Sequence, residues 1–282
     1  MLRRLPRDLA LALAGFGWVG LGLLLDHDAG VWRQRAIGIV TWALVAALLA
    51  GESRAVRTQV VLVIVAATCV EYAASVGLGL YTYRLGNVPL FVPPGHGLVY
   101  LSAIALGRSR LFAERRRLLV SATLAVAGAW AFVALLGPRH DVLGAVLFVF
   151  FARFCLAGRA PLVYCGAFLL TSYLELLGTG LGSWTWARHT AGGLIPMGNP
   201  PSVISGAYCF LDLFGLAVAP RLVALGSSRF SGLLDRRHRQ PQTVQPLVVV
   251  LGSLLGAAPD HGATAPVDPV GEAQPLLVPD VG

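Results

Sequence analysis

The chain contains little charge for its length. Only 13% of its 282 residues are charged, against roughly 25% in a soluble domain, whereas 56% are hydrophobic. The mean hydropathy of +0.71 argues against a soluble fold, because so large an apolar fraction needs lipid as its solvent. All 22 basic residues are arginine and lie in short gaps between apolar runs. This pattern is typical of membrane topology and argues against a nucleic-acid partner.

Signatures of several enzyme classes are missing. The sequence has no Walker loop, GxSxG elbow, HExxH pair or Asp-rich prenyl-diphosphate motif. These absences argue against nucleotide-driven pumps, serine hydrolases, zinc proteases and magnesium-dependent prenyltransferases. The four cysteines fall in or beside apolar runs, without CxxC or Cys/His metal spacing. We therefore expect no structural disulfide, no bound metal and no other cofactor.

Eight apolar runs predict an all-α bundle that crosses the membrane about eight times. They cover residues 9–25, 36–51, 60–80, 91–106, 118–136, 142–157, 161–181 and 200–218. Helices are expected because unpaired backbone in hydrocarbon is costly, and because these runs lack the alternation of barrel strands. The first run follows a basic start, as in a signal peptide. It lacks a convincing cleavage site before Asp26, and we interpret it as a retained span.

The arginine distribution predicts the orientation of the spans. With the N-terminus in the cytoplasm, 17 arginines lie on that side and 5 on the other. This bias predicts a multi-pass protein of the plasma membrane with both termini cytoplasmic. Residues 223–282 are first basic and then rich in Pro, Gly, Ala and Asp, which predicts a low-complexity cytoplasmic tail.

A shift of 103 residues lays one part of the chain over another. Under this shift, Gly77-Leu78-Gly79 meets Gly180-Leu181-Gly182, Tyr81-Thr82-Tyr83 meets Trp184-Thr185-Trp186, and His96 meets Asn199. With a slip of one residue, Glu71 also meets Glu175. The match predicts two tandem four-helix repeats, residues 1–107 and 108–222. An even number of crossings gives them the same orientation, related by a pseudo-two-fold axis along the membrane normal.

Three acidic residues are the candidate catalytic groups. Glu71 and Glu175 lie within predicted spans at nearly equivalent repeat positions, and Asp212 lies in the last span without a repeat partner. An ionised acid in hydrocarbon is costly, by roughly 2.5 to 3.5 kcal/mol, so each should face a protein-lined cavity. The alternative is that these carboxyl groups only hydrogen-bond neighbouring helices.

Eight further residues are candidates for substrate binding. They are Tyr81, Tyr83, Arg84, His96, Trp184, Trp186, Arg188 and Asn199. Aromatic faces beside a buried acid suit a carbocation or a long unsaturated ligand. The alternatives are an ordinary aromatic belt at the membrane interface and a histidine with a structural hydrogen bond.

The stretch from Glu71 to His96 resembles a family of carotenoid-biosynthesis membrane proteins. It combines Glu-x5-Gly-Leu-Gly-x-Tyr-Thr-Tyr with Val-Pro-Leu-Phe-Val-Pro-Pro, and the family includes the bisanhydrobacterioruberin-type carotenoid hydratases. The resemblance implies acid-catalysed hydration of a carbon–carbon double bond in a carotenoid or other isoprenoid lipid. Glu71 would then donate the proton, and Glu175 or Asp212 would orient water.

Three functions remain open from the sequence. The first is an isoprenoid hydratase, or a cyclase if water is excluded from the same site. The second is a proton-coupled transporter or a lipid-binding membrane protein without catalysis. The third is an assembly subunit whose polar residues only join helices.

Overall fold

The computed structural model describes residues 6–238. The elements are α1 (Arg7–Asp26), α2 (Val31–Ala50), α3 (Arg54–Glu71), η1 (Tyr72–Gly77), β1 (Tyr81–Tyr83), α4 (Val92–Arg108), α5 (Arg110–Glu114), α6 (Arg116–Leu136), α7 (Val142–Ala157), α8 (Pro161–Gly180), β2 (Trp184–Trp186), η2 (Ala191–Gly193) and α9 (Ser205–His238). Of the predicted tail, residues 223–238 continue α9, and residues 239–282 lie outside the described residues.

The predicted helical architecture is confirmed. Every apolar run picked out in the sequence overlaps one of the helices α1 to α4 or α6 to α9, although the third run continues from α3 into η1 and α9 extends well beyond the last run, to His238. Within the described chain, five helices are long and apolar enough to cross a membrane: α1, α2, α3 continued by η1, α6 and α8. Helix α7 is equally apolar but shorter, with 16 residues. The number of crossings stays a prediction.

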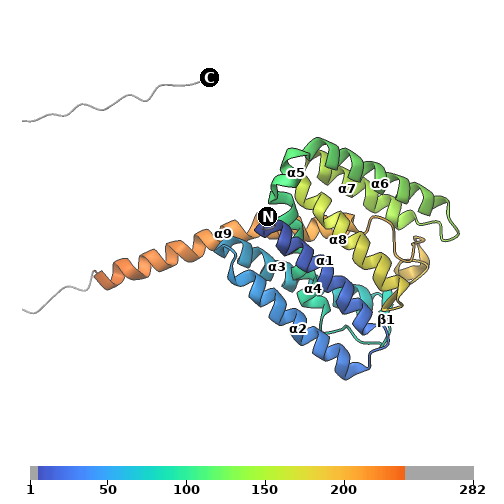
Figure 1. Ribbon diagram of the computed structural model, residues 1–282, viewed down its shortest axis with the longest axis horizontal. Coiled ribbons are helices and arrows are strands. Elements are labelled where there is room, and N and C mark those ends of the chain that lie inside the picture. Colours follow the sequence, from blue (N-terminus) through green and yellow to red (C-terminus); the bar gives the residue numbers. More distant parts are fainter. Residues whose placement is uncertain (1–5, 239–282) are drawn as a thin grey trace, which may run out of the picture. The chain divides into compact units, whose positions relative to one another are not determined.

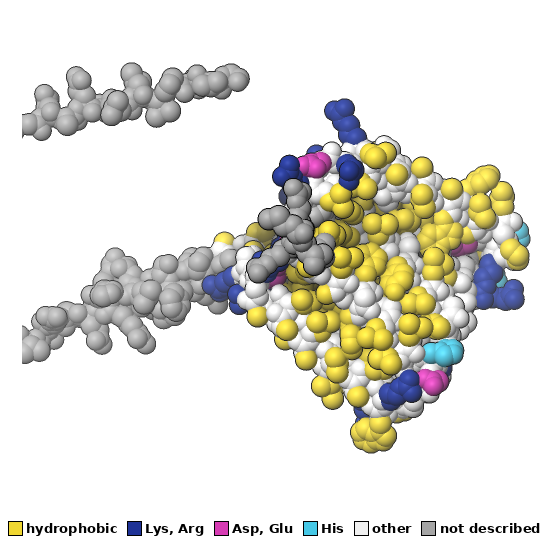
Figure 2. Space-filling view, in the orientation of Figure 1, with side chains coloured by type: hydrophobic (Ala, Val, Ile, Leu, Met, Phe, Trp, Pro, Cys, Tyr) yellow, Lys and Arg dark blue, Asp and Glu magenta, His cyan; other side chains and the backbone are white. Residues whose placement is uncertain are grey.

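The surface of the helical body is apolar. Figure 2 shows hydrophobic side chains across the visible face, whereas charged side chains gather at its edges, where helices begin and end. Large aliphatic side chains stand outward, among them Ile39, Val133 and Val149, which are 64%, 68% and 65% exposed. Soluble monomers rarely expose contiguous apolar patches of such extent. Together with the five long helices, this surface indicates a membrane protein.

Helix α4 lies at the centre of the packing. It contacts α1, α2 and α3 from the first part of the chain and α8 from the second, while α6, α7 and α8 pack together (Figure 1). Helices α4 and α8 approach closely because Gly166 faces the backbone of Ala103. A Cβ on Gly166 would lie 3.1 Å from that backbone. Small residues commonly allow such close contact between membrane helices.

Ion pairs join the helix ends at one end of the first four helices. Arg108, which ends α4, donates to both oxygens of Glu52 at 2.7 and 2.8 Å and to Asp8 at 2.6 Å. Arg7, which begins α1, donates to Glu52 at 3.0 Å. The start of α1, the α2–α3 loop and the end of α4 therefore meet, as they do when successive helices alternate in direction.

Two short strands were not predicted, and they are an addition to the otherwise helical fold. β1 and β2 pair antiparallel, with Tyr81 opposite Trp186, Thr82 opposite Thr185 and Tyr83 opposite Trp184. In both strands the aromatic side chains are buried and the threonine is exposed, as the period of two in a strand requires.

Each strand follows a turn that depends on glycine. Gly79 and Gly182 have φ angles of 61° and 71°, in the left-handed region that glycine adopts without strain. The two turns redirect the chain from the ends of η1 and α8 into β1 and β2. The Gly-Leu-Gly motif therefore places both aromatic segments beside the glutamate-bearing helices.

Candidate functional site

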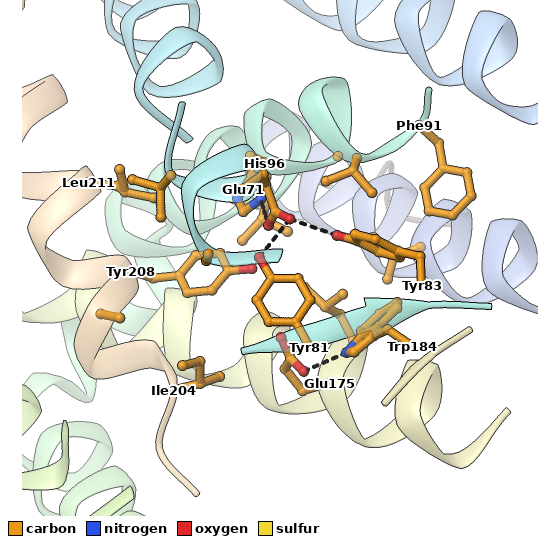
Figure 3. A pocket seen from close by; sticks show the side chains of 18 of the residues that line it. Glu71, Tyr81, Tyr83, Phe91, His96, Glu175, Trp184, Ile204, Tyr208 and Leu211 are labelled. Atoms are coloured by element: carbon orange, nitrogen blue, oxygen red, sulfur yellow. Dashed lines mark hydrogen bonds and ion pairs between the residues drawn. The ribbon is translucent and has the colours of Figure 1, made fainter. Parts of the chain in front are cut away.

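Glu71 and Glu175 line one cavity. Its volume is about 390 Å³, within the range of small-molecule sites, roughly 300 to 1,000 Å³. The walls come from α1, α2, α3, α4, α7, α8, α9 and both strands, and they are mostly aliphatic and aromatic. Figure 3 shows the two carboxyl groups with the ring of Tyr81 between them in this view.

The carboxyl group of Glu71 is held on both oxygens. The hydroxyls of Tyr81 and Tyr83 each donate to Oε2 at 2.7 Å, and Nε2 of His96 lies 2.8 Å from Oε1. The tyrosines reach the same oxygen because residues two apart in a strand point to one face. Burial, and then the charge of Glu71, raises the pKa of both tyrosines in β1. Both hydroxyls therefore remain protonated donors.

The carboxyl group of Glu175 is held on one oxygen only. The indole Nε1 atoms of Trp184 and Trp186 donate to its Oε2 at 2.9 and 3.1 Å. Its Oε1 has no hydrogen bond within the described part of the chain. Gly178, one turn further along α8, makes room for this arrangement, because a Cβ there would overlap the ring of Trp184.

The strand pairing brings the four aromatic rings together across the cavity. The ring centroids of Tyr81 and Trp186 are 4.5 Å apart, and those of Tyr83 and Trp184 are 6.2 Å apart. In the antiparallel register, each tyrosine that donates to Glu71 therefore lies opposite a tryptophan that donates to Glu175. All four aromatic side chains line the cavity that contains the two acids.

Tyr208 of α9 is a site residue that the sequence reasoning missed. It lines the cavity, and its ring stacks on His96 with centroids 5.3 Å apart and planes inclined by 25°. Its hydroxyl points towards the Glu71 side of the cavity in Figure 3 and has no hydrogen bond to any described residue. The only available signal was its position four residues before Asp212, on the same face of a helix.

Asp212 and Arg84 do not line the cavity, contrary to the sequence interpretation. Asp212 is 3% exposed but faces another part of the bundle. The guanidinium of Arg84 donates to the carbonyls of Asp26 and Ala29 at 2.6 and 2.7 Å. Arg84 therefore ties the α1–α2 loop to the end of β1, which is a structural role.

Arg188 and Asn199 also lie away from the cavity wall. Arg188 is exposed. Asn199 accepts a hydrogen bond on Oδ1 from the backbone N–H of Trp186 at 2.9 Å. Asn199 therefore fixes the position of β2 and touches the site only through Trp186.

The arrangement provides the parts of an acid–base site. Seven of the predicted residues line the cavity, namely Glu71, Tyr81, Tyr83, His96, Glu175, Trp184 and Trp186. Among the described residues, no three His, Cys, Asp or Glu side chains lie close enough together to hold a metal ion. Two carboxyl groups, one imidazole and a free hydroxyl in an apolar cavity can donate, accept and pass a proton.

The fold and the site together define a helical membrane protein with an acidic and aromatic cavity inside the bundle. Comparisons with protein-family models, with curated proteins and with solved structures find no match for the chain. The residues of the cavity are therefore the best indication of its function.

Proposed function

We propose that the cavity is the active site of an integral membrane enzyme that hydrates a carbon–carbon double bond of a carotenoid or other isoprenoid lipid. The observation that carries this proposal is the unequal bonding of the two acids in one apolar cavity. Both oxygens of Glu71 are engaged, Oε2 by two tyrosine hydroxyls and Oε1 by Nε2 of His96, whereas Glu175 keeps Oε1 free while Oε2 accepts from two indoles. One acid is thus placed to donate a proton and the other to receive one.

The wall of the cavity supports a hydrocarbon substrate that enters from the bilayer. Val70 of α3 and Phe210 of α9 both line the cavity and are 53% and 48% exposed. The cavity therefore reaches the apolar outer surface of the bundle at these residues. A lipid-soluble chain can pass through such an opening without crossing water.

The roles of the two glutamates differ from those expected from the sequence. Because indole N–H groups only donate, Oε2 of Glu175 acts as an acceptor and a proton on this acid resides on Oε1. Transfer of that proton to an alkene carbon forms a C–H bond and leaves a tertiary cation on the neighbouring carbon. The faces of Tyr81 and Trp186 stabilise the positive charge. Glu175, not Glu71, is therefore the proposed proton donor.

Capture of the cation by water completes the reaction. The water oxygen forms the new C–O bond, and its proton passes to the Glu71–His96 pair, which the Tyr81 and Tyr83 hydroxyls hold in place. Proton transfer back to Glu175 resets the site. The net change is the addition of one water molecule, and no electrons are gained or lost.

We further propose that the chain forms two four-helix repeats, residues 1–107 and 108–222, that together make eight crossings. The β1–β2 pairing supports the repeat, because it is symmetric about the pair formed by Thr82 and Thr185. The matching turns at Gly79 and Gly182 support it as well. In each half, two aromatic donors from a strand hold the preceding glutamate. The arginine bias supports cytoplasmic termini in a plasma membrane.

Expression in a host that accumulates an acyclic carotenoid tests the proposed reaction. The wild-type protein and the exposed control Glu114→Gln should yield a product heavier by one water molecule. Glu175→Gln and Glu71→Gln should each lower its yield at least about 100-fold, as expected for loss of a general acid or base. A carotenoid pool of unchanged mass would contradict hydration, and a cyclic isomer of the same mass would indicate a cyclase.

A proton-coupled transporter is the second candidate. The observation that favours it is the presence of Glu71, His96 and Glu175 on one cavity wall, because such groups can relay a proton. Proton flux in liposomes that disappears with Glu71→Gln, without any product in the carotenoid assay, would support transport in place of catalysis.

A further inference from the structure

A second polar cluster lies inside the bundle, next to the cavity but not part of its wall. Tyr208, Asp212 and Gly215 follow one face of α9 at intervals of four and three residues, so their positions lie in a line along the helix. Tyr208 stands at the cavity end of this line. At the other end, the hydroxyl of Tyr100 from α4 packs against Gly215, where a Cβ would lie 3.1 Å from it.

Three buried oxygen atoms in this region have no protein partner. They are Oδ2 of Asp212 and the hydroxyls of Tyr100 and Tyr164, none of which forms a hydrogen bond within the described part of the chain. Asp212, Tyr100 and Tyr164 are only 3%, 1% and 0% exposed. Buried polar atoms are almost always hydrogen-bonded, so a group of three without protein partners needs an explanation.

The three side chains come from different helices of the bundle. Tyr100 lies on α4, Tyr164 on α8 and Asp212 on α9. Gly215, one turn beyond Asp212 on α9, lies against the Tyr100 hydroxyl. Cys209, one turn before Asp212, belongs to the same core cluster as Tyr164. A carboxylate oxygen accepts hydrogen bonds, whereas a tyrosine hydroxyl both donates and accepts. Together they offer the mixed set of partners that a water molecule requires.

We propose that Asp212, Tyr100 and Tyr164 bind water inside the bundle, one helical turn from the cavity. Buried waters typically make two to four hydrogen bonds to polar groups that otherwise lack partners. The site explains why a carboxyl group without an ion partner is placed there. Its use as the source of the water that the reaction consumes rests on the proposed function, but the binding of water does not.

Hydroxyl-radical footprinting tests the water site in the full-length protein in nanodiscs. Radiolysis of bound water labels the side chains beside it, even where they are closed to bulk solvent. Tyr100 and Tyr164 should be labelled several-fold faster than Phe151, an equally buried aromatic residue of the same bundle. In Asp212→Leu, the two rates should fall to that of Phe151. In Asp212→Asn they should persist, because the amide still binds water.

The outcomes separate this proposal from the proposed function. The water site would be overturned if Tyr100 and Tyr164 of the wild-type protein were labelled only as fast as Phe151. It would also be overturned if their labelling were unchanged in Asp212→Leu. If the labelling pattern is found but no hydration product forms, the water site stands and the proposed reaction falls. If both hold, Asp212→Leu should lower the hydration rate several-fold while polyene binding, measured by tryptophan quenching, is unchanged.

Discussion

Glu71 and Glu175 differ in the residues that hydrogen-bond to their carboxyl groups. Tyrosine hydroxyls and a histidine surround Glu71, and each of these groups can also accept a proton or a hydrogen bond. The two indoles on Glu175 can only donate, and both donate to Oε2, so Oε1 has no hydrogen bond within the described part of the chain. Two chemically identical side chains thus have different hydrogen-bond partners, and on this difference rest the different roles proposed for them.

Glu52 gives a prediction about pH, because it lies in a loop outside the proposed spans. The hydrogen bond from Arg108 keeps the pKa of Glu52 below its usual value of 4.5. A carboxyl group with a lowered folded-state pKa stabilises the fold above its unfolded pKa, and that contribution is lost as the pH falls through the folded-state pKa. The ion pair therefore contributes fully at neutral pH and disappears in acid below pH 4.5.

The variant Glu52→Gln should lower the free energy of unfolding by about 1 to 3 kcal/mol at pH 7, because Glu52 is buried but both arginines are partly exposed. Thermal unfolding in detergent at several pH values measures this difference. It should shrink when the pH falls below 4.5. The exposed control Glu114→Gln should change the stability little at any pH. If the stability difference between the wild-type protein and Glu52→Gln stayed constant down to pH 3, about 1.5 units below 4.5, the lowered pKa of Glu52 would be contradicted.

Among the elements, helices were predictable and strands were not. Hydropathy places the helices because a membrane span needs a long apolar run, and the eight runs, of 16 to 21 residues, come close to or reach that length. A three-residue strand has no such run. Tyr81-Thr82-Tyr83 and Trp184-Thr185-Trp186 could be matched as repeats, but the matching alone did not predict that they pair with each other. Their pairing depends on how the two halves meet in space, which local sequence does not encode.

The site was only partly predictable for the same reason. The repeat singled out both glutamates and their aromatic neighbours, because these residue types are unusual in apolar runs. The sequence interpretation placed Asp212 at the cavity because an acid in a span must be buried inside the protein. Spacing along the chain does not tell which neighbouring helix the acid faces, so its actual position could not be predicted. Tyr208 was missed because a single tyrosine in an apolar helix is unremarkable without its stacking partner His96.

The contact between Gly178 of α8 and Trp184 of β2 predicts the effect of a larger side chain at position 178. In Gly178→Ala, the new methyl group meets the ring of Trp184, which is held by its bond to Glu175 and cannot move freely. Overpacking of this kind should lower the free energy of unfolding by about 1 to 3 kcal/mol. Gly180→Ala, two residues further along, is a matched control because nothing lies within 4 Å of its Cβ position.

Thermal unfolding of both alanine variants, with tryptophan fluorescence as the probe, checks this contact. Gly178→Ala should also shift the fluorescence of the folded state, because the indole of Trp184 is displaced. Equal stability of the two variants would contradict the tight contact between α8 and β2.

At the scale of the whole molecule, the helix ends divide into two groups. Arg7, Glu52 and Arg108 join one set of ends, while at the other set Arg84 bonds to the α1–α2 loop. The arginine-rich loops belong to the first group. By the positive-inside rule this end should face the cytoplasm.

Cysteine labelling tests this orientation. In a variant without the four native cysteines, Ser53→Cys should react with an impermeant maleimide only after permeabilisation. Thr82→Cys, an exposed position at the other set of ends, should react in intact cells. The reverse pattern would contradict cytoplasmic termini, and labelling of both positions in intact cells would contradict their placement on opposite sides of the membrane.

Hydration can be followed directly with the purified protein in nanodiscs, an acyclic carotenoid and water enriched in heavy oxygen. The wild-type protein should form a product that carries one heavy oxygen atom and two added hydrogen atoms, and Glu175→Gln should not form it. A carotenoid recovered without added oxygen from the wild-type reaction would contradict hydration at this site.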